Sequence, residues 1–274
     1  MRRISTFCFI WLAGILTFTS ICNAHGANSW NNFISPTVNL VNEATDHPGA
    51  QLFLDLIEEA GYESIEEWVQ SCCQVINKEL YATVDEANAI GLTKITYIFT
   101  DGGALSSKDG AAPHITVSFD LNYLVSFYEK HGANAARDEL YGVLCHELMH
   151  GYQREPVGAG VYQKGDEFFG FIEGTADLGR MLTGGFNPQR FPSAGNHWND
   201  GYCNTAFFYK WILETRDPEF LVRLNATCKT QKPWSLDKAL EELFGEEVSA
   251  QMMWSQFENE IPQFNSEANA WVND

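Results

Sequence analysis

Two histidines and a glutamate within five residues are the first candidates for chemistry in this sequence. His146, Glu147 and His150 form an H-E-x-x-H motif, and residues four apart lie on one face of a helix. Both imidazoles can therefore bind one ion while the Glu147 carboxylate projects beside it. Zinc suits this set because it accepts neutral histidine nitrogen and takes about four ligands. A water at the remaining position would give Glu147 a proton to take up.

A second acidic segment supplies candidates for the rest of such a site. Glu173 lies 23 residues after His150, beyond a loop in which the chain can reverse, and we expect it to be the third metal ligand. Asp177 is one turn further on, and we expect its carboxylate to accept a ring N–H of a ligating histidine. Tyr202 and His197 are the candidates for an additional donor to an oxyanion. A structural role for Tyr202 and a surface position for His197 remain open.

The elements that must position these residues follow an α+β order. A helix that begins near Ala135 and ends near Gly151 carries the H-E-x-x-H motif on an apolar stripe. A Gly- and Pro-containing loop over residues 154–165 leads to a helix near 166–182, whose three glycines predict close approach to another backbone. We expect strands over residues 92–99 and 115–119, and further helices over 49–60, 65–82, 121–130, 202–215 and 235–260.

The first 24 residues have the order of a secretory signal peptide. Arg2 and Arg3 are followed by an apolar run and then by small residues up to Ala24. We therefore expect a secreted protein, extracellular or periplasmic after cleavage, although an N-terminal membrane anchor is an alternative. Residues 25–274 are expected to form one domain, with an α/β part to about residue 153 and a helical part after it.

Five cysteines remain once this leader is removed, and an oxidising compartment favours disulfides. Because five is odd, at least one thiol is free or pairs between chains. We favour a bond between Cys203 and Cys228, each near the end of an expected helix. Asn225 begins an N-glycosylation motif, which would be used only in a eukaryotic source and which also occurs by chance.

The charge of the chain limits its partners. Lys and Arg number 17 against 36 Asp and Glu, a formal net charge of −19, and removal of Arg2 and Arg3 gives 15 minus 36, or −21. Such a polyanion repels nucleic acid and anionic lipid surfaces. We therefore expect no nucleic-acid or membrane partner. The expected peptide or protein substrate rests on the metal-site motif and not on the charge, and the oligomeric state is not indicated. An apolar content of 45% excludes a disordered chain.

Further motifs extend over most of the mature chain. H-E-x-x-H-x-x-Q over His146–Gln153 is followed by I-E-G-x-A-D over Ile172–Asp177. Together with three more stretches, these motifs resemble the basic secretory protein family, metallopeptidase-like proteins of plants and microbes, roughly from Val41 to Ile261. The three stretches are Val41–Thr45 with Pro48-Gly49, Trp198–Tyr202 with Thr205-Ala206, and Phe220–Asn225.

This resemblance implies a zincin-like metallopeptidase fold with a small mixed sheet, an edge strand beside the H-E-x-x-H helix and a mostly helical C-terminal half. Residues 114–119 are the expected edge strand, where an extended peptide could pair. The resemblance also implies His146, His150 and Glu173 as zinc ligands and Glu147 as the catalytic carboxylate. The chain departs from the family in being strongly acidic, whereas the family is named after basic members.

Two functions fit these residues. The first is a secreted zinc-dependent peptidase that hydrolyses peptide bonds through a zinc-bound water, with Glu147 as general base and acid. The second is a secreted non-catalytic binding or defence-related protein that retains zinc for structure. An open coordination position favours the enzyme and a closed one favours the binding protein. The sequence contains neither the G-x-S-x-G motif of serine hydrolases nor a phosphate-binding G-x-x-x-x-G-K-[ST] loop.

Overall fold

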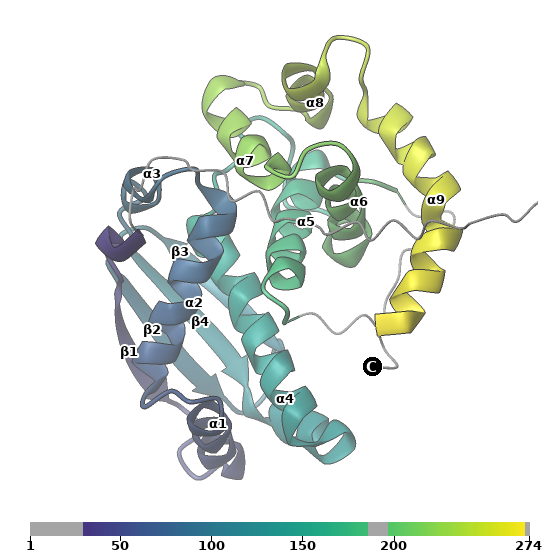
Figure 1. Ribbon diagram of the computed structural model, residues 1–274. Helices are drawn as coiled ribbons and strands as arrows, with labels where there is room; N and C mark the ends of the chain where they lie inside the picture. Colours follow the sequence, from purple (N-terminus) through teal and green to yellow (C-terminus); the bar gives the residue numbers. More distant parts are fainter. Residues whose placement is uncertain (1–29, 186–196, 272–274) are drawn as a thin grey trace, which may run out of the picture.

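A mixed four-stranded sheet and the helices packed on it form the N-terminal half of the molecule (Figure 1). The computed structural model describes residues 30–185 and 197–271, so the expected signal peptide lies outside the described residues. The strands are β1 (Thr37–Asn42), β2 (Lys94–Thr100), β3 (Ser106–Ala111) and β4 (His114–Asp120), in the spatial order β1-β2-β4-β3. The pairs β1–β2 and β2–β4 are parallel, and β3 is antiparallel to β4.

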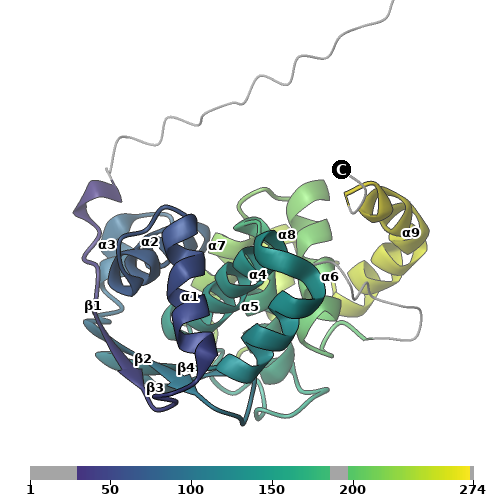
Figure 2. The same cartoon turned by 90° about the horizontal axis from the view of Figure 1, so that it is seen from below.

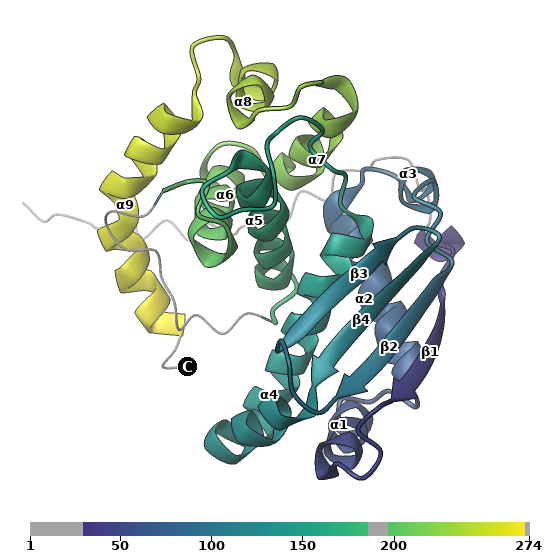
Figure 3. The ribbon, with the colours of Figure 1, turned by 180° about the vertical axis from the view of Figure 1, so that it is seen from behind.

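The helices of this half cover one face of the sheet. They are α1 (Pro48–Glu59), α2 (Ile65–Leu80), the short α3 (Val84–Asn88) and α4 (Leu121–Tyr152). Alternate residues of β2 and β4 are buried, with Ile95 opposite Ile115, Tyr97 opposite Val117 and Phe99 opposite Phe119. Viewed from below, α1, α2 and α4 lie on the same side of the strands (Figure 2), and the view from behind shows the other face of the sheet (Figure 3).

The prediction that residues 114–119 form an edge strand is wrong. The segment over 114–119 is β4, which lies between β2 and β3, so the edge beside α4 is formed by β3 instead. The sequence of β3, SSKDGA, shows no alternation of apolar and polar residues because four of its six residues are polar, the other two are Gly and Ala, and its burial is slight. Neither β3 nor the other edge strand, β1, was predicted.

The two helices expected over 121–130 and from residue 135 are joined in α4. Gly132 sits at their junction with φ 82° and ψ 176°, a non-helical conformation that kinks the helix. Asp120 caps the N-terminus by accepting the backbone N–H of Asn122. The straight segment after Gly132 then runs across the sheet and carries the H-E-x-x-H motif in its last two turns.

The C-terminal half is helical and packs on the end of α4 (Figure 1). Its helices are α5 (Glu167–Leu182), α6 (Tyr202–Thr215), α7 (Phe220–Thr230), α8 (Leu236–Phe244) and α9 (Ala250–Trp271). The helix expected over 235–260 is therefore two helices, separated after Gly245. The α+β class with a mostly helical C-terminal half is confirmed. Over residues 30–185 and 197–271, every helix is too short or too polar to cross a bilayer.

The structure bears on the expected Cys203–Cys228 disulfide and on the glycosylation motif at Asn225. Cys228 is buried on α7 and, like Cys72, Cys73 and Cys145, is a free thiol in this structure, so the expected bond with Cys203 is not formed. The expectation was based on the position of each cysteine near the end of a helix, and such a position does not indicate how far apart two residues lie in the fold. Asn225 is 1% exposed. Its side chain accepts a hydrogen bond from the backbone N–H of Arg154 at 2.8 Å and donates one to the carbonyl of Leu80 at 3.0 Å. A glycan on Asn225 is therefore incompatible with the folded chain.

Candidate metal centre

The last two turns of α4 place both histidines of the motif on one face. Nε2 of His146 and Nε2 of His150 lie 3.1 Å apart, and their rings are nearly perpendicular at 4.7 Å between centroids. Leu144 and Leu148 are fully buried on the sheet side of the helix and fix its rotation. The one-turn spacing therefore directs two ring nitrogens at a common point, as the motif predicted.

Helix α5 brings Glu173 to the same point. Its Oε2 lies 3.3 Å from Nε2 of His146 and its Oε1 lies 3.7 Å from Nε2 of His150. One donor atom from each of the three residues lies within 4.8 Å of the other two. Glu173 is 1% exposed. Two elements separated in sequence by a loop thus present two nitrogens and a carboxylate to one small volume.

Glycines allow α5 to approach its neighbours this closely. A Cβ at Gly174 would lie 2.3 Å from the methyl group of Thr205 on α6, and one at Gly179 would lie 2.6 Å from the side chain of Met149 on α4. Larger side chains at these positions would push α5 away from α4 and α6. The close approach predicted from the glycines is therefore observed, and it sets the distance between Glu173 and the two histidines.

A hydrogen-bonded support holds the outer nitrogen of each ring. Nδ1 of His146 lies 2.7 Å from Oδ1 of Asp177, and Nδ1 of His150 lies 2.9 Å from the side-chain amide of Gln153. The hydroxyl of Thr175 contacts that amide at 2.6 Å. The Asp177 carboxylate accepts Nδ1–H of His146 and so leaves the lone pair of that ring's Nε2 directed at the centre. The Gln153 atom that faces Nδ1 of His150 is the amide nitrogen, while the amide oxygen accepts from Thr175. Gln153 and Thr175 belong to the two motifs, but the motifs predicted no such role for them.

The electrostatics of the centre favour a cation. Oε2 of Glu173 is buried and has no hydrogen-bond partner among the described residues, a costly state for a carboxylate unless a positive group faces it. Burial lowers the pKa of His146, but the hydrogen bond to Asp177 and the adjacent Glu173 carboxylate raise it more, so the net shift is upward. Burial raises the pKa of Glu173, while the nearby histidines bring it below its ordinary value. Two imidazoles and a buried carboxylate that converge on one point are a suitable set of ligands for a divalent metal ion.

Glu147 lies beside the ligands, between α4 and β3. Its side chain is buried, and burial raises its pKa above the ordinary value for a glutamate. The charge of His146, a hydrogen bond with Ser106 and the charge of Lys108 act in the opposite direction. Ser106 and Lys108 are alternate residues of β3. The edge strand therefore contacts the one carboxylate of the motif that is not a candidate ligand.

Two tyrosines border the centre. The Tyr162 hydroxyl donates to Oε1 of Glu173, and the Tyr202 ring stacks on the His146 ring at 6.0 Å between centroids. Tyr162 is 59% exposed and Tyr202 47% exposed, so both rings are in reach of a bound molecule. Tyr202 was expected near the site from the sequence. Tyr162 was not, because it comes from the loop between α4 and α5, and a loop has no periodicity that predicts where its side chains point.

His197 lies apart from this arrangement. Its Nδ1 bonds to the side chain of Asn199, and its ring packs near Trp198 and Trp254 at centroid distances of 5.3 and 6.5 Å. In the described part of the chain, the group of residues that could hold a metal ion consists of His146, His150 and Glu173, and His197 is not a member of it. The structure thus assembles His146, His150, Glu147, Glu173, Asp177 and Tyr202 and leaves His197 on another surface.

Comparison with known proteins agrees with this site. No curated protein and no solved structure was found to match the chain. A family model described as "BSP: Peptidase of plants and bacteria" matches residues 35–257, which include both motifs and every strand. The chain therefore belongs to the BSP family of peptidases of plants and bacteria.

Proposed function

We propose that this protein is a zinc-dependent peptidase that hydrolyses peptide or protein substrates. The observation that carries the proposal is the convergence of Nε2 of His146, Nε2 of His150 and a buried, unpartnered carboxylate oxygen of Glu173. These three residues would hold the metal. Zinc bound there would supply a Lewis acid that polarises the substrate carbonyl and lowers the pKa of a water to about 7.

Glu147 is proposed to move the proton. Its carboxylate takes a proton from the attacking water and delivers it to the nitrogen of the leaving amine. The side chain is suited to this because it is 6% exposed, and bulk water therefore does not compete for the proton. Ser106 on β3 lies beside the carboxylate.

The two tyrosines are proposed to act on the substrate carbonyl oxygen. Both hydroxyls lie near Glu173, and that of Tyr162 donates to it directly. A hydroxyl that can turn from Glu173 to a bound carbonyl would donate to the charge that develops on its oxygen. Asp177 would act indirectly, because it orients the ring of His146.

The edge strand β3 is the proposed docking site for the peptide. One side of β3 pairs with β4, and its other side borders no strand of the four-stranded sheet. An extended peptide could add there by main-chain hydrogen bonds. Since Ser106 contacts Glu147, a peptide on β3 would pass next to the proposed proton carrier.

The direct test compares Glu147→Gln with the wild type. Metal analysis of the purified protein should find one zinc in both, and digestion of a broad peptide library should be lost in the variant alone. Glu129→Gln is the matched control, because Glu129 is an exposed carboxylate on the same helix. Unchanged cleavage by Glu147→Gln would contradict the role of Glu147. Zinc without cleavage of any peptide by the wild type would favour the non-catalytic binding protein.

Secretion is part of the proposal. It is supported by the order of basic, apolar and small residues over positions 1–24. Expression of the full gene and N-terminal sequencing of the exported protein should give a mature chain that begins near His25. Retention of Met1 on a membrane-bound product would favour the anchor instead.

A further inference from the structure

Two cysteines from different helices meet directly behind the candidate metal centre. Sγ of Cys72 on α2 and Sγ of Cys145 on α4 lie 2.8 Å apart, and both residues are fully buried. Cys145 immediately precedes His146 in the sequence. The contact therefore joins the ligand-bearing turn of α4 to α2, a helix that contributes no donor atom to the centre.

The separation of these sulfurs is short for two thiols. Non-bonded carbon atoms pack at about 3.5–4.0 Å, and sulfur is larger than carbon. A disulfide has a bond length of about 2.05 Å, so the two sulfurs at 2.8 Å need to approach by only about 0.75 Å. We propose that Cys72 and Cys145 form a disulfide that fixes the metal-ligand helix α4 to α2. The inference does not depend on the proposed activity.

The neighbouring cysteine does not compete for this bond. Cys73 is also fully buried, but its thiol lies beside the side chain of Tyr152. Adjacent residues of a helix point about 100° apart, so Cys72 and Cys73 face different neighbours. Of the two, Cys72 is the partner of Cys145.

Bond formation requires a disulfide oxidant, of low molecular weight or on an oxidoreductase. The thiolate of Cys145 or Cys72 attacks one sulfur of the oxidant, which forms a mixed disulfide and releases one thiol. The other cysteine then attacks the protein sulfur of that mixed disulfide and releases the second thiol. Two electrons and two protons pass from the cysteine pair to the oxidant. A secretory route would provide such an oxidising environment.

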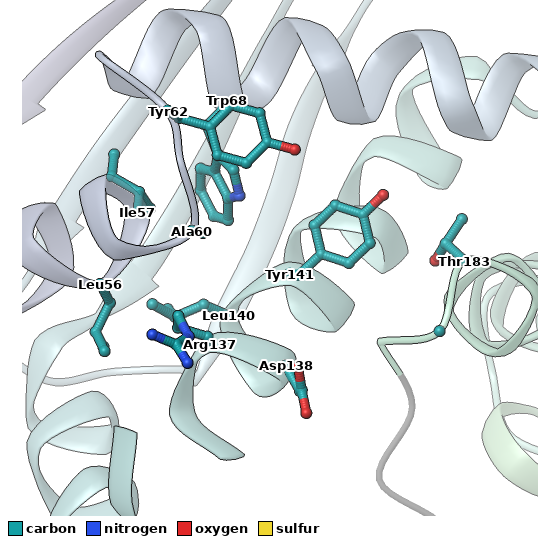
Figure 4. A pocket seen from close by; sticks show the side chains of 11 residues that line it. Leu56, Ile57, Ala60, Tyr62, Trp68, Arg137, Asp138, Leu140, Tyr141 and Thr183 are labelled. Carbon is teal, nitrogen blue, oxygen red and sulfur yellow. The ribbon is translucent and has the colours of Figure 1, made fainter. Parts of the chain in front are cut away.

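A cavity of about 320 Å³ lies between α1, α2 and α4 (Figure 4), and neither cysteine of the pair lines it. Tyr141 and Thr183 line this cavity and lie beside the sulfur of Cys145. Trp68 lines it one turn before Cys72. Reagents can therefore reach the wall of side chains but not the sulfurs, and the bond should resist reduction in the folded protein.

The test is peptide mapping of the full chain without reduction. The purified protein is unfolded in guanidinium, refolded in a buffer of oxidised and reduced glutathione, alkylated with N-ethylmaleimide in guanidinium and digested. We expect a peptide that contains Cys72-Cys73 linked to the peptide that contains Cys145, while the peptide with Cys228 carries the label. Label on Cys145 in all molecules would overturn the proposal.

Two variants assign the bond within the linked peptides. Cys73→Ala should retain the link, and Cys72→Ala should lose it and carry the label on Cys145. The reverse result would place the bond on Cys73 and contradict the proposal. Because the wild-type map already decides whether Cys145 is linked, failure of a variant to fold does not affect that outcome.

Discussion

The two sides of α4 near residue 146 differ in almost every respect. One side presents His146, Glu147 and His150 to α5 and β3, and its side chains are polar. The other side presents Cys145 and Leu148, both fully buried, to α2 and the sheet. The first side carries the proposed chemistry, and the second carries the contacts that hold the helix in place. Adjacent positions in the sequence therefore have separable roles in chemistry and in stability.

The largest expected effect belongs to the polar side. Glu147→Gln removes the group that carries the proton, and kcat should fall by about 10²- to 10⁴-fold. Zinc content and the free energy of unfolding should stay close to those of the wild type, because Glu147 is not among the candidate ligands. Steady-state kinetics with metal analysis measure both. Loss of zinc in this variant would contradict the proposal that Glu147 carries the proton while His146 and His150 bind the metal.

The buried side should give the reverse pattern. Cys72→Ala opens a closed loop of about 70 residues and should lower the free energy of unfolding of the oxidised protein by about 4 kcal/mol. The activity of the fraction that remains folded should be unchanged, because Cys72 lies on α2, away from the ligands. Urea unfolding of wild type and variant, each with and without reductant, measures the difference. Equal stability of all four samples would mean that no bond restrains α4.

A weaker effect is expected for the support of the ligands. Asp177→Asn keeps the shape of the side chain but replaces the carboxylate that faces Nδ1 of His146. Zinc affinity should fall about 10- to 100-fold, as measured by competition with a chromophoric chelator. Thr175→Ser keeps the hydroxyl that contacts Gln153 and serves as the control. An unchanged affinity in Asp177→Asn would show that the carboxylate only packs against the ring.

The smallest effect is expected at the border of the site. Tyr162→Phe removes one neutral hydrogen-bond donor, worth about 0.5–1.5 kcal/mol, so kcat/KM should fall by up to about tenfold. Zinc content should not change, since Glu173 keeps its carboxylate. The same substitution at Tyr128, an exposed tyrosine near the start of α4, is the control. A total loss of activity in Tyr162→Phe would give this tyrosine a role as large as that of Glu147.

The parts of this site that could be predicted from the sequence depend on short-range geometry. The spacing of His146 and His150 fixes their common face once the segment is helical, and glycines in α5 indicate a close helix contact. Glu173 needed a fold in which α5 returns to α4, which the length of the intervening loop allowed and the family resemblance implied. The α+β class was predicted correctly from the order of the expected elements, and the family from the motifs.

The parts that could not be predicted depend on long-range contacts. Strand β3 has no apolar alternation because little of it is buried, so only its pairing with β4 identifies it. The approach of Tyr162 to Glu173 depends on the path of a loop, and the approach of Cys72 to Cys145 on the packing of two helices. The expected Cys203–Cys228 bond was wrong because it was based on local position alone.

The central claim is that one cation is held by His146, His150 and Glu173. Anomalous diffraction at the zinc edge from crystals of the zinc-loaded protein tests it most directly. We expect a single strong peak about 2.0–2.2 Å from Nε2 of His146, Nε2 of His150 and a carboxylate oxygen of Glu173. A peak elsewhere, or two histidines bound to zinc with the Glu173 carboxylate turned away, would contradict the account.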